Sequence, residues 1–506
     1  MKKIIGRILI VVPAIALQIL WYLLVLGVMN SLFHQQLWDA LNMLLSILAV
    51  IFVTGLIAKR DESSYKLLWV MVIVAMPILG TMLYFLLGNQ QTGRKLRKQL
   101  AQSAAALTMP QADETCLSKI KEEDLRLGQT VERVCNATGF PVLKNDTAKY
   151  YPFGEDMFAD MCDDLRGARS YIYVEYFIIQ SGKFWDTLLD IMTQKVAEGV
   201  DVRVMYDDLG SIGTYSVSDI LALSRKGIKC IPFNPFLFIK SQLNNRDHRK
   251  ILVIDGKVAY SGGVNLADEY INEIHPYGVW KDVGFRITGD AVKSYVYMFA
   301  EFWNAFSGDK IAPEVAVCQQ QEAAEDGYIL SYYDSPIHRE HISNELFVEV
   351  LSAATDYVWF YTPYLMLGDA LFDAFLRAAK RGVDVRILMP GIPDKKLVYR
   401  LSRSYYPDLL KAGVKIYEYT PGFLHAKAFV SDDKIAGIGT VNLDYRSLFL
   451  HFECSSLFIN AGIITSLKQD FLETQSLSKQ RTLADTKKGI LHTLGNNFLR
   501  VIAPLL

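Results

Sequence analysis

The sequence predicts an α/β fold with two pseudo-symmetric lobes that share one active site, preceded by N-terminal transmembrane helices. Three observations support this prediction. Long uncharged apolar runs open the chain, and short β-rich runs alternate with helical stretches in the rest. The pentapeptide GVDVR occurs at 199–203 and again at 382–386. A repeat with so long a period indicates a duplicated domain and not a solenoid.

The apolar runs lie at about 8–29, 40–58 and 67–87, within a predicted membrane region of residues 1–89. A helix needs about 20 apolar residues to cross the hydrocarbon core, so each run is long enough to span. The third contains Pro77 and Gly80 and is expected to kink. Basic residues precede the first run, separate the second from the third, and follow the third. Three crossings cannot place all of them in the cytoplasm, so the side of the catalytic lobes stays open.

The remaining chain divides into a polar juxtamembrane linker (90–125), a first lobe (126–325), a second lobe (326–480) and an amphipathic tail (481–506). RKGIK at 225–229 resembles KAGVK at 411–415, and both follow a copy of GVDVR. Two repeats in the same order strengthen the duplication. The predicted strands are 171–178, 202–206, 251–254, 359–361, 385–388 and 434–438, and the predicted helices include 185–197, 291–306 and 370–380.

Each lobe carries one copy of a chemical motif, DHRKILVIDGKVAYSGGVN at 247–265 and LHAKAFVSDDKIAGIGTVN at 424–442. The spacings agree throughout: two residues from His to Lys, five from Lys to Asp and ten from Asp to Asn. The first copy supplies His248, Lys250, Asp255 and Asn265. The second copy supplies His425, Lys427, Asp432 and Asn442. A lone H-x-K is weak evidence, but two copies with matched spacing in a duplicated domain are strong.

These residue types suit phosphodiester chemistry. On a strand, H-x-K places both side chains on one face, so two such strands can surround one phosphate. Lys250 and Lys427 would neutralise its oxygens, and Asn265 and Asn442 would donate hydrogen bonds to it. One imidazole would attack phosphorus, and the other would protonate the leaving alkoxide and then deprotonate the incoming alcohol.

Each imidazole needs a partner on its other nitrogen. Asp282, 34 residues after His248, and Glu453, 28 residues after His425, are the predicted orienting carboxylates, and the alternative is two surface acids. Asp255 and Asp432 belong to the catalytic motif, but they are expected to hydrogen-bond in the turn after each strand.

Composition excludes several classes of protein. The formal net charge of −1 argues against nucleic acid as a partner. The six cysteines include no C-x-x-C pair, so neither a disulfide framework nor a zinc site is expected. His338 and His341 form the only H-x-x-H pair. We therefore predict no metal and no other cofactor.

The two motifs match H-x-K-x4-D, the signature of the phospholipase D superfamily. YDDLGS (206–211), WKDVGFRITG (280–289), GTVNLDYRS (439–447) and the apolar segment at 66–88 resemble bacterial cardiolipin synthases, a likeness that covers most of the chain. This resemblance implies two phospholipase D-type lobes in a multi-pass protein of the bacterial plasma membrane. It further implies transfer of a phosphatidyl group from one phosphatidylglycerol to another, giving cardiolipin and glycerol through a phospho-histidine. By analogy His248 is the nucleophile and His425 the acid/base, although pseudo-symmetry allows the reverse. The family commonly has two apolar segments, one fewer than this chain.

Other functions stay open at this point. A phospholipase D-type hydrolase, or a headgroup-exchange enzyme with another alcohol acceptor, would use the same residues. A catalytically inactive lipid-binding protein is disfavoured because both motifs are intact. The second substrate, the acyl-chain preference and the oligomeric state are not predicted. In the tail, apolar residues recur at helical spacing and predict an amphipathic helix that lies either on a lipid surface or on the protein's own core. They are Ile490, Leu494, Phe498, Val501 and Leu505, with Ile502 adjoining.

Overall fold

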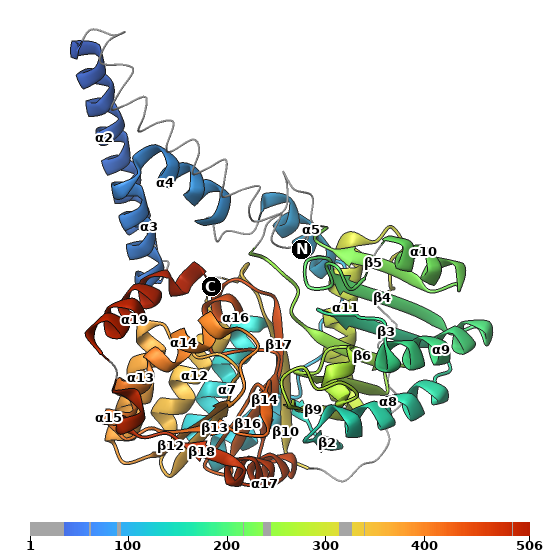
Figure 1. Ribbon diagram of the computed structural model, residues 1–506. Helices are drawn as coiled ribbons and strands as arrows, with labels where there is room; N and C mark the ends of the chain where they lie inside the picture. The colour runs from blue at the N-terminus through green and yellow to red at the C-terminus, as the bar shows by residue number, and fades with distance from the viewer. Residues whose placement is uncertain are drawn as a thin grey trace. The chain divides into compact units, whose positions relative to one another are not determined.

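The computed structural model (Figure 1) describes residues 35–59, 62–88, 93–215, 217–235, 244–312, 326–338, 340–487 and 489–505. The chain divides into two compact units, an N-terminal unit within Met1–Gln90 and a catalytic unit within Gln91–Pro504. The first predicted apolar run, 8–29, lies outside the described residues.

The N-terminal unit contains the other two apolar runs. The second lies in α2 (Gln35–Ile57), whereas the third is broken into α3 (Ser63–Ala75), α4 (Pro77–Leu83) and a π-helical turn, Tyr84–Gly88. The break follows from Pro77, whose ring disfavours a helical conformation at the preceding Met76, where φ is −142°. At Gly80 a Cβ atom would lie 2.5 Å from the Val72 carbonyl oxygen, so glycine lets α4 pack closely on α3. The predicted kink is confirmed.

A small core holds this unit together, formed by the side chains of Leu56, Tyr65, Trp69, Ile73 and Tyr84. Outside it, α2 exposes Met43, Val50 and Ile51, each more than 60% accessible. Among the helices that the structure describes, none combines the length and hydropathy that crossing a membrane requires.

The first lobe of the catalytic unit is built on a sheet with the strand order β2, β9, β7, β6, β3, β4, β5. In that order the bounds are Ala148–Tyr151, Gly284–Thr288, Val258–Gly262, Lys250–Ile254, Tyr171–Tyr176, Asp201–Asp207 and Lys229–Phe233. Helices α8, α9, α10 and α11 accompany it, with the bounds Gly154–Gly167, Lys183–Ala197, Val217–Arg225 and Val292–Phe306. β3, β4 and β5 are parallel, and β6 is antiparallel to β3.

The second lobe has a sheet with the order β1, β10, β17, β16, β15, β11, β12, β13, β18. In that order the bounds are Leu143–Lys144, Tyr328–Asp334, Glu453–Ile459, Ile435–Gly439, Ala428–Ser431, Tyr357–Tyr361, Asp384–Pro390, Lys415–Tyr419 and Ser478–Gln480. Its helices α12 to α19 are Ile342–Ala353, Asp369–Lys380, Lys396–Ser404, Tyr406–Ala412, Tyr445–Phe449, Ile463–Ser476, Leu483–Thr486 and Ile490–Ile502.

The two sheets share one topology, which confirms the duplication. The order β9, β7, β6, β3, β4, β5 in the first lobe corresponds to β17, β16, β15, β11, β12, β13 in the second. In both series the last three strands are parallel, and the strand before them is antiparallel. The GVDVR copies lead into β4 and β12, so the sequence repeat marks equivalent strands.

The lobe boundary differs from the predicted one. α7 (Leu125–Thr138) packs on α12, and β1 pairs with β10, so both belong to the second lobe although they precede the first in sequence. The predicted linker contains two further helices, α5 (Arg94–Ala105) and α6 (Glu114–Glu123). α5 packs against α11 and so covers part of the first lobe.

Contacts between the lobes lie along a common seam (Figure 1). The helix α11 is buried from Val292 to Trp303 on almost every side and contacts strands of both sheets. A second link is a two-stranded parallel ribbon in which β8 (Val279–Lys281) of the first lobe pairs with β14 (Gly422–Leu424) of the second. β14 leads directly into the second motif, and β8 ends directly before Asp282.

Candidate active site

Both H-x-K motifs lie where a strand begins. Lys250 is the first residue of β6, and His425 and Lys427 lie between β14 and β15. The expectation that the histidines lie within these strands is therefore wrong. The backbone N–H of His248 donates to the Phe452 carbonyl at 2.8 Å, and that of His425 donates to the Lys281 carbonyl at 2.7 Å. Each bond crosses from one lobe to the other, which fixes each histidine at the seam.

These backbone bonds also bring in the orienting carboxylates, because Phe452 precedes Glu453 and Lys281 precedes Asp282. His248 Nδ1 lies 2.8 Å from Glu453 Oε2 and 3.0 Å from Oε1. His425 Nδ1 lies 2.6 Å from Asp282 Oδ2. Each histidine thus pairs with the acid of the opposite lobe, and not with the acid that follows it in its own lobe.

The carboxylates are held by further donors. The Ser447 hydroxyl donates to Glu453 Oε1 at 2.6 Å, and the Thr440 hydroxyl donates to Oε2. Asp282 Oδ1 accepts the backbone N–H of Val283 at 2.9 Å. Both carboxylates are fully buried, whereas each histidine side chain is 9% exposed. A buried acid on Nδ1 fixes the Nδ1–H tautomer and leaves Nε2 of each histidine as the reactive nitrogen.

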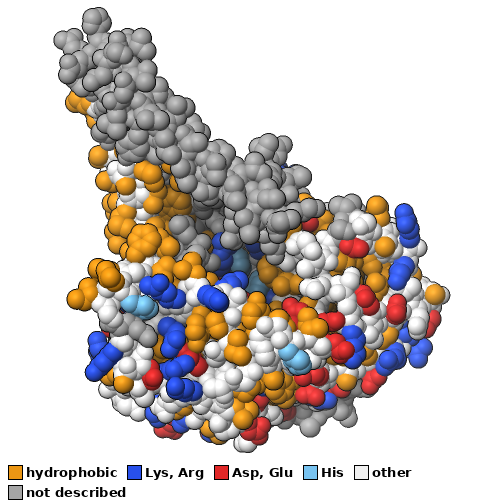
Figure 2. All heavy atoms as spheres, in the orientation of Figure 1, with side chains coloured by type: hydrophobic (Ala, Val, Ile, Leu, Met, Phe, Trp, Pro, Cys, Tyr) orange, Lys and Arg blue, Asp and Glu red, His pale blue; other side chains and the backbone are white. Residues whose placement is uncertain are grey.

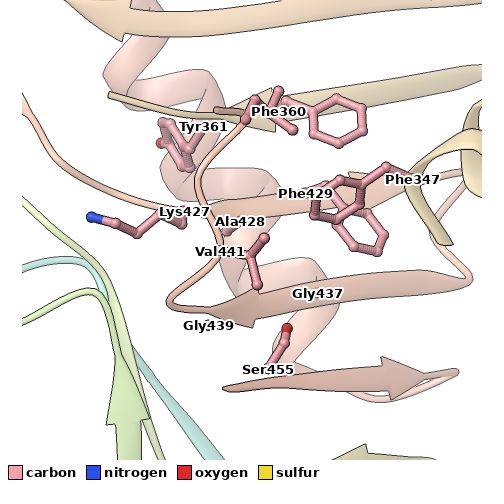
Figure 3. A pocket seen from close by; sticks show the side chains of 11 residues that line it. Phe347, Phe360, Tyr361, Lys427, Ala428, Phe429, Gly437, Gly439, Val441 and Ser455 are labelled. Atoms are coloured by element: carbon pink, nitrogen blue, oxygen red, sulfur yellow. The ribbon is translucent and has the colours of Figure 1, made fainter. Parts of the chain in front are cut away.

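The lysines of the motifs lie beside the histidines. Lys250 Nζ donates to the His248 carbonyl at 2.6 Å. Lys427 Nζ lies 2.7 Å from His425 Nδ1 and 4.0 Å from Asp282 Oδ2. Figure 3 shows the Lys427 side chain extending toward strands of the first lobe, away from the aromatic side chains of Phe347, Phe360 and Phe429. The two ammonium groups can therefore act on one phosphate at the seam.

Burial sets the ionisation of this cluster. It lowers the pKa of Lys250 to about 8 and that of Lys427 to about 7. Burial and the neighbouring lysines hold the pKa of both imidazoles, His248 and His425, well below 6.5. Burial raises the pKa of Asp282 to about 6. The free site therefore holds neutral imidazoles, as a nucleophile requires, and weakly basic lysines that an anionic phosphate would stabilise in the charged form.

The two motif asparagines differ in their surroundings. Asn265 is engaged within the protein, since its Oδ1 accepts the Ile178 N–H at 3.2 Å and its Nδ2 donates to the Tyr270 hydroxyl at 2.8 Å. Asn442 Oδ1 is buried without a hydrogen-bond partner among the described residues. The unused atom of Asn442 is an acceptor, which an anionic phosphate does not need, so phosphate binding by either asparagine stays a prediction.

Asp255 and Asp432 lie at the opposite ends of β6 and β15 from the histidines. Asp255 accepts the backbone N–H groups of residues 169, 170 and 171 at 2.7–2.9 Å. Asp432 accepts those of residues 355, 356 and 357 at 2.8–3.0 Å. These acids therefore fasten the segment that enters β3 or β11, and do not bond only within their own turn. Both have a left-handed backbone, with φ of 53° and 50°.

Sequence analysis missed His451, in the HFE segment beside Glu453. Its Nδ1 lies 3.7 Å from Glu453 Oε1, its ring centroid lies 5.7 Å from that of His248, and burial lowers its pKa to about 4. Among the described residues, His248, His451 and Glu453 form the one group that could hold a metal ion, with ligand atoms within 4.8 Å of one another. His338 stacks on Tyr333 and His341 packs on Phe449, away from this group.

Arginines that flank His248 support the site from the interior. Arg246 forms a buried ion pair with Asp207 of the YDDLGS segment, at 2.9 Å. Arg249 pairs with Asp247 at 3.1 Å and with Glu175, and its guanidinium lies over the Phe302 ring. These ion pairs position the segment that carries the histidine.

Comparison with known proteins agrees with this geometry. The family model "Cardiolipin synthase, PLD-like domain" matches residues 161–297 and 347–474, and a phospholipase D-nuclease N-terminal model matches residues 44–89. A cardiolipin synthase of Halalkalibacterium halodurans is 32% identical over 90% of this chain and 92% of its own length. An uncharacterized protein of Streptococcus mutans is 42% identical over 89% of this chain and 98% of its own.

A solved structure supports the fold. The crystal structure of phosphatidylserine synthase from Haemophilus influenzae aligns with 74% of this chain and all of its own, with a TM-score of 0.57 and 14% identity. Two matched sheets, paired H-x-K motifs at one seam, and relatives that span nearly the whole chain all agree. The chain belongs to the cardiolipin synthase family of phospholipase D-like phosphatidyltransferases.

Proposed function

We propose that the paired motifs transfer a phosphatidyl group between two phosphatidylglycerols through a phospho-histidine on His248. The observation that carries the proposal is the crossed arrangement of the site. Each histidine takes its backbone partner and its carboxylate from the opposite lobe, so the two motifs make one centre. The relatives named cardiolipin synthase indicate the substrate class.

In the first step, His248 Nε2 attacks the phosphorus of one phosphatidylglycerol. The P–O bond to the glycerol headgroup breaks, and the leaving alkoxide takes the Nε2 proton of His425, which is protonated once the anionic phosphate is bound. The phosphate and Asp282 together stabilise this imidazolium. Glycerol departs, and the phosphatidyl group stays bonded to His248. Lys250 and Lys427 stabilise the charge on the nonbridging oxygens.

In the second step, a headgroup hydroxyl of another phosphatidylglycerol attacks the phospho-histidine and gives its proton to His425. The P–N bond breaks, cardiolipin forms and His248 is released. The environments of the two acids support this assignment of roles. Glu453 accepts hydrogen bonds from the Thr440 and Ser447 hydroxyls, whereas burial raises the pKa of Asp282, the partner of His425, to about 6. A carboxyl that titrates near neutrality suits the histidine that gives a proton in the first step and takes one in the second.

Membrane attachment through the N-terminal unit is part of the proposal. The exposed apolar side chains of α2, among them Met43, Val50 and Ile51, would contact acyl chains. Alkaline carbonate extraction of cell membranes tests the attachment, since an embedded protein stays in the pellet. Labelling of single cysteines introduced before and after each apolar run would count the crossings of this proposed multi-pass segment.

The reaction is tested by lipid mass spectrometry on the purified full-length enzyme. Incubated with phosphatidylglycerol alone, it should release glycerol and cardiolipin in equal amounts. Release of phosphatidate in place of cardiolipin would identify a hydrolase. Faster cardiolipin formation after addition of phosphatidylethanolamine, with release of ethanolamine, would identify a different phosphatidyl donor. A preparation with both histidines replaced by alanine controls for contaminating enzymes.

A further inference from the structure

The C-terminal helix α19 is fastened to the second lobe by one of its faces. Leu499 is buried, and the Arg500 guanidinium lies 4.6 Å from the Tyr405 ring centroid and donates to the Ser404 carbonyl. Arg400 of α14 donates to Asn496 Oδ1 at 3.0 Å. The face that carries Leu499, Asn496 and Arg500 therefore holds the helix on α14 and α15.

The opposite face of α19 is apolar and exposed. Ile490 is 81% accessible, Leu491 85%, Leu494 59% and Phe498 65%. The sequence left open whether this stripe covers the protein's own core. In the structure Ile490, Leu494 and Phe498 stay exposed, whereas Ile502, at the far end of the helix, packs against the core. Leu397 of the neighbouring α14 is also exposed, at 48%. We call these five side chains the α19 apolar face. A cluster of large exposed apolar side chains marks an interaction surface.

This face continues toward the rim of the active site through α14. Lys395, directly before α14, has its Nζ 3.5 Å from the Tyr364 hydroxyl and over the Tyr364 ring. Tyr364 packs near Phe423, whose ring lies 5.7 Å from that of His425. One short run of contacts thus joins the catalytic histidine to the surface.

Basic side chains accompany the apolar ones. Lys395 is 63% exposed, and Lys396 and Lys487 are exposed as well. Figure 2 shows hydrophobic side chains beside lysines and arginines on this part of the catalytic unit. Large apolar side chains with adjacent lysines are typical of helices that lie in the interface of an anionic bilayer. A second copy of the chain is a poorer occupant, because two-fold pairing of this face would bring its lysines together.

We propose that the α19 apolar face docks on the surface of an anionic phospholipid bilayer, with its apolar side chains at the boundary between headgroups and acyl chains. Lys395 and Lys396 would contact the headgroup phosphates. Docking would bring the rim of the site to the level of the phosphodiesters that react there, so the inference deepens the proposed function and rests on it for the lipid substrate.

The first test measures contact with lipid in the full-length enzyme. Phe498→Trp is reconstituted in phosphatidylglycerol vesicles with brominated acyl chains, and the fluorescence that the new tryptophan adds to wild type is recorded. Bromine quenches a ring that enters the bilayer, so we expect quenching. Leu221→Trp, on α10 at a site that is 54% exposed, is the matched control and should stay unquenched. Added fluorescence that only aqueous iodide quenches would place the face in water and overturn the proposal. Fluorescence that neither agent quenches would indicate cover by protein and would also overturn it.

The second test separates docking from folding. Leu494→Ser/Phe498→Ser should lower turnover on vesicles about tenfold, since two large apolar contacts with lipid are lost, and leave turnover in detergent micelles within about twofold. Leu221→Ser is the control. An equal loss in both assays would mean that the face serves the fold and would sink the proposal. Quenching does not depend on the product, so a failure to form cardiolipin would count against the proposed function alone.

Discussion

At the scale of single residues, the site depends on two histidine–carboxylate pairs, each formed between one lobe and the other. His248 is held by Glu453 and His425 by Asp282, with Nδ1–oxygen distances of 2.8 and 2.6 Å. Neither lobe contains a complete histidine–carboxylate pair of its own. The two pairs lie along one seam, and in the proposed reaction they act on one phosphorus atom from its two sides, as an attacking and a leaving group require.

Single-histidine variants test this shared site. His248→Ala and His425→Ala should each lower turnover at least ~10³-fold, because members of one catalytic unit fail together. The double variant should be little slower than either single one. His275→Ala, at an exposed position, controls for general effects. Radiolabelled phosphatidylglycerol should label wild type at His248, and a label found only on His425 would exchange their roles. Near-normal turnover in either single variant would contradict the shared site.

The lysines predict the alkaline side of the pH profile. Burial lowers the pKa of Lys427 to about 7 and that of Lys250 to about 8. The protonated form binds phosphate, so kcat/KM, which reports on the free enzyme, should fall as pH rises through 7 to 8. In Lys427→Arg the guanidinium stays charged, so the fall should begin at higher pH even if the rate is lower. If kcat/KM falls at the wild-type pH in both Lys427→Arg and Lys250→Arg, a group other than these lysines controls the alkaline side of the profile.

Excess chelator tests whether the buried group of His248, His451 and Glu453, which could hold a metal ion, takes part in the reaction. The lysines supply the positive charge in the proposed steps, so turnover in micelles should be unchanged by EDTA. Added Zn²⁺ is expected to inhibit, because coordination by His248, His451 and Glu453 would occupy the nucleophile. His451→Phe should relieve that inhibition. Activity that EDTA abolishes and a divalent ion restores would contradict the proposed mechanism.

At the scale of elements, equivalent strands hold equivalent residues. The H-x-K motif precedes or begins β6 and β15, and the motif aspartate ends the same strand, where it fastens the entry to β3 or β11. The motif therefore has two functions. One end of the strand carries the residues proposed for the chemistry, and the other end fastens the neighbouring strand of the sheet.

Stability measurements should separate these functions. Asp432→Ala removes the acceptor of three backbone N–H groups and places alanine at φ 50°, so unfolding should cost about 1–3 kcal/mol less and the Tm should fall. Asp432→Asn keeps one acceptor oxygen and tolerates that backbone, so its loss should be smaller. Asp373→Ala, on the exposed surface of α13, is the control. Turnover per folded molecule should stay near wild type, and a ~10³-fold loss without a change in Tm would make Asp432 catalytic after all.

The same elements show what the sequence can predict. Matched motif spacing and the GVDVR repeat predicted the duplication, which the two sheets confirm, and singled out the histidines and lysines that the structure brings to the seam, because both signals are local patterns. The crossed pairing could not be predicted. Asp282 and Glu453 follow the histidines of their own lobes at similar distances, and sequence spacing does not show which side chains of the other lobe lie across the seam. Nor could the place of α7 and β1, because their partners lie far along the chain: Leu143 of β1 pairs with Ile329, and Arg133 of α7 with Glu345 of α12. His451 left one signal, its position two residues before Glu453.

At the scale of the whole molecule, we propose that the chain meets a bilayer in two ways. The N-terminal unit has its own small core and exposed apolar side chains on α2. The catalytic unit has separate cores and carries the α19 apolar face. One attachment would keep the enzyme at the membrane, and the other would orient the site toward headgroups.

Deleting residues 1–90 tests this division. The fragment 91–506 contains both sheets and their cores, so it should fold and keep its turnover on phosphatidylglycerol in micelles. It should bind phosphatidylglycerol vesicles through α19 and be released by about 0.5 M salt, since charges between exposed groups are screened at that ionic strength. Full-length protein should resist the same wash.

Leu494→Ser/Phe498→Ser in the fragment should abolish vesicle binding without changing its Tm, whereas Leu221→Ser should leave vesicle binding intact. Sedimentation with vesicles of phosphatidylglycerol or phosphatidylcholine measures all four proteins. A fragment that binds both lipids equally would show that charge takes no part, and a fragment that binds neither would leave the N-terminal unit as the one attachment to the membrane.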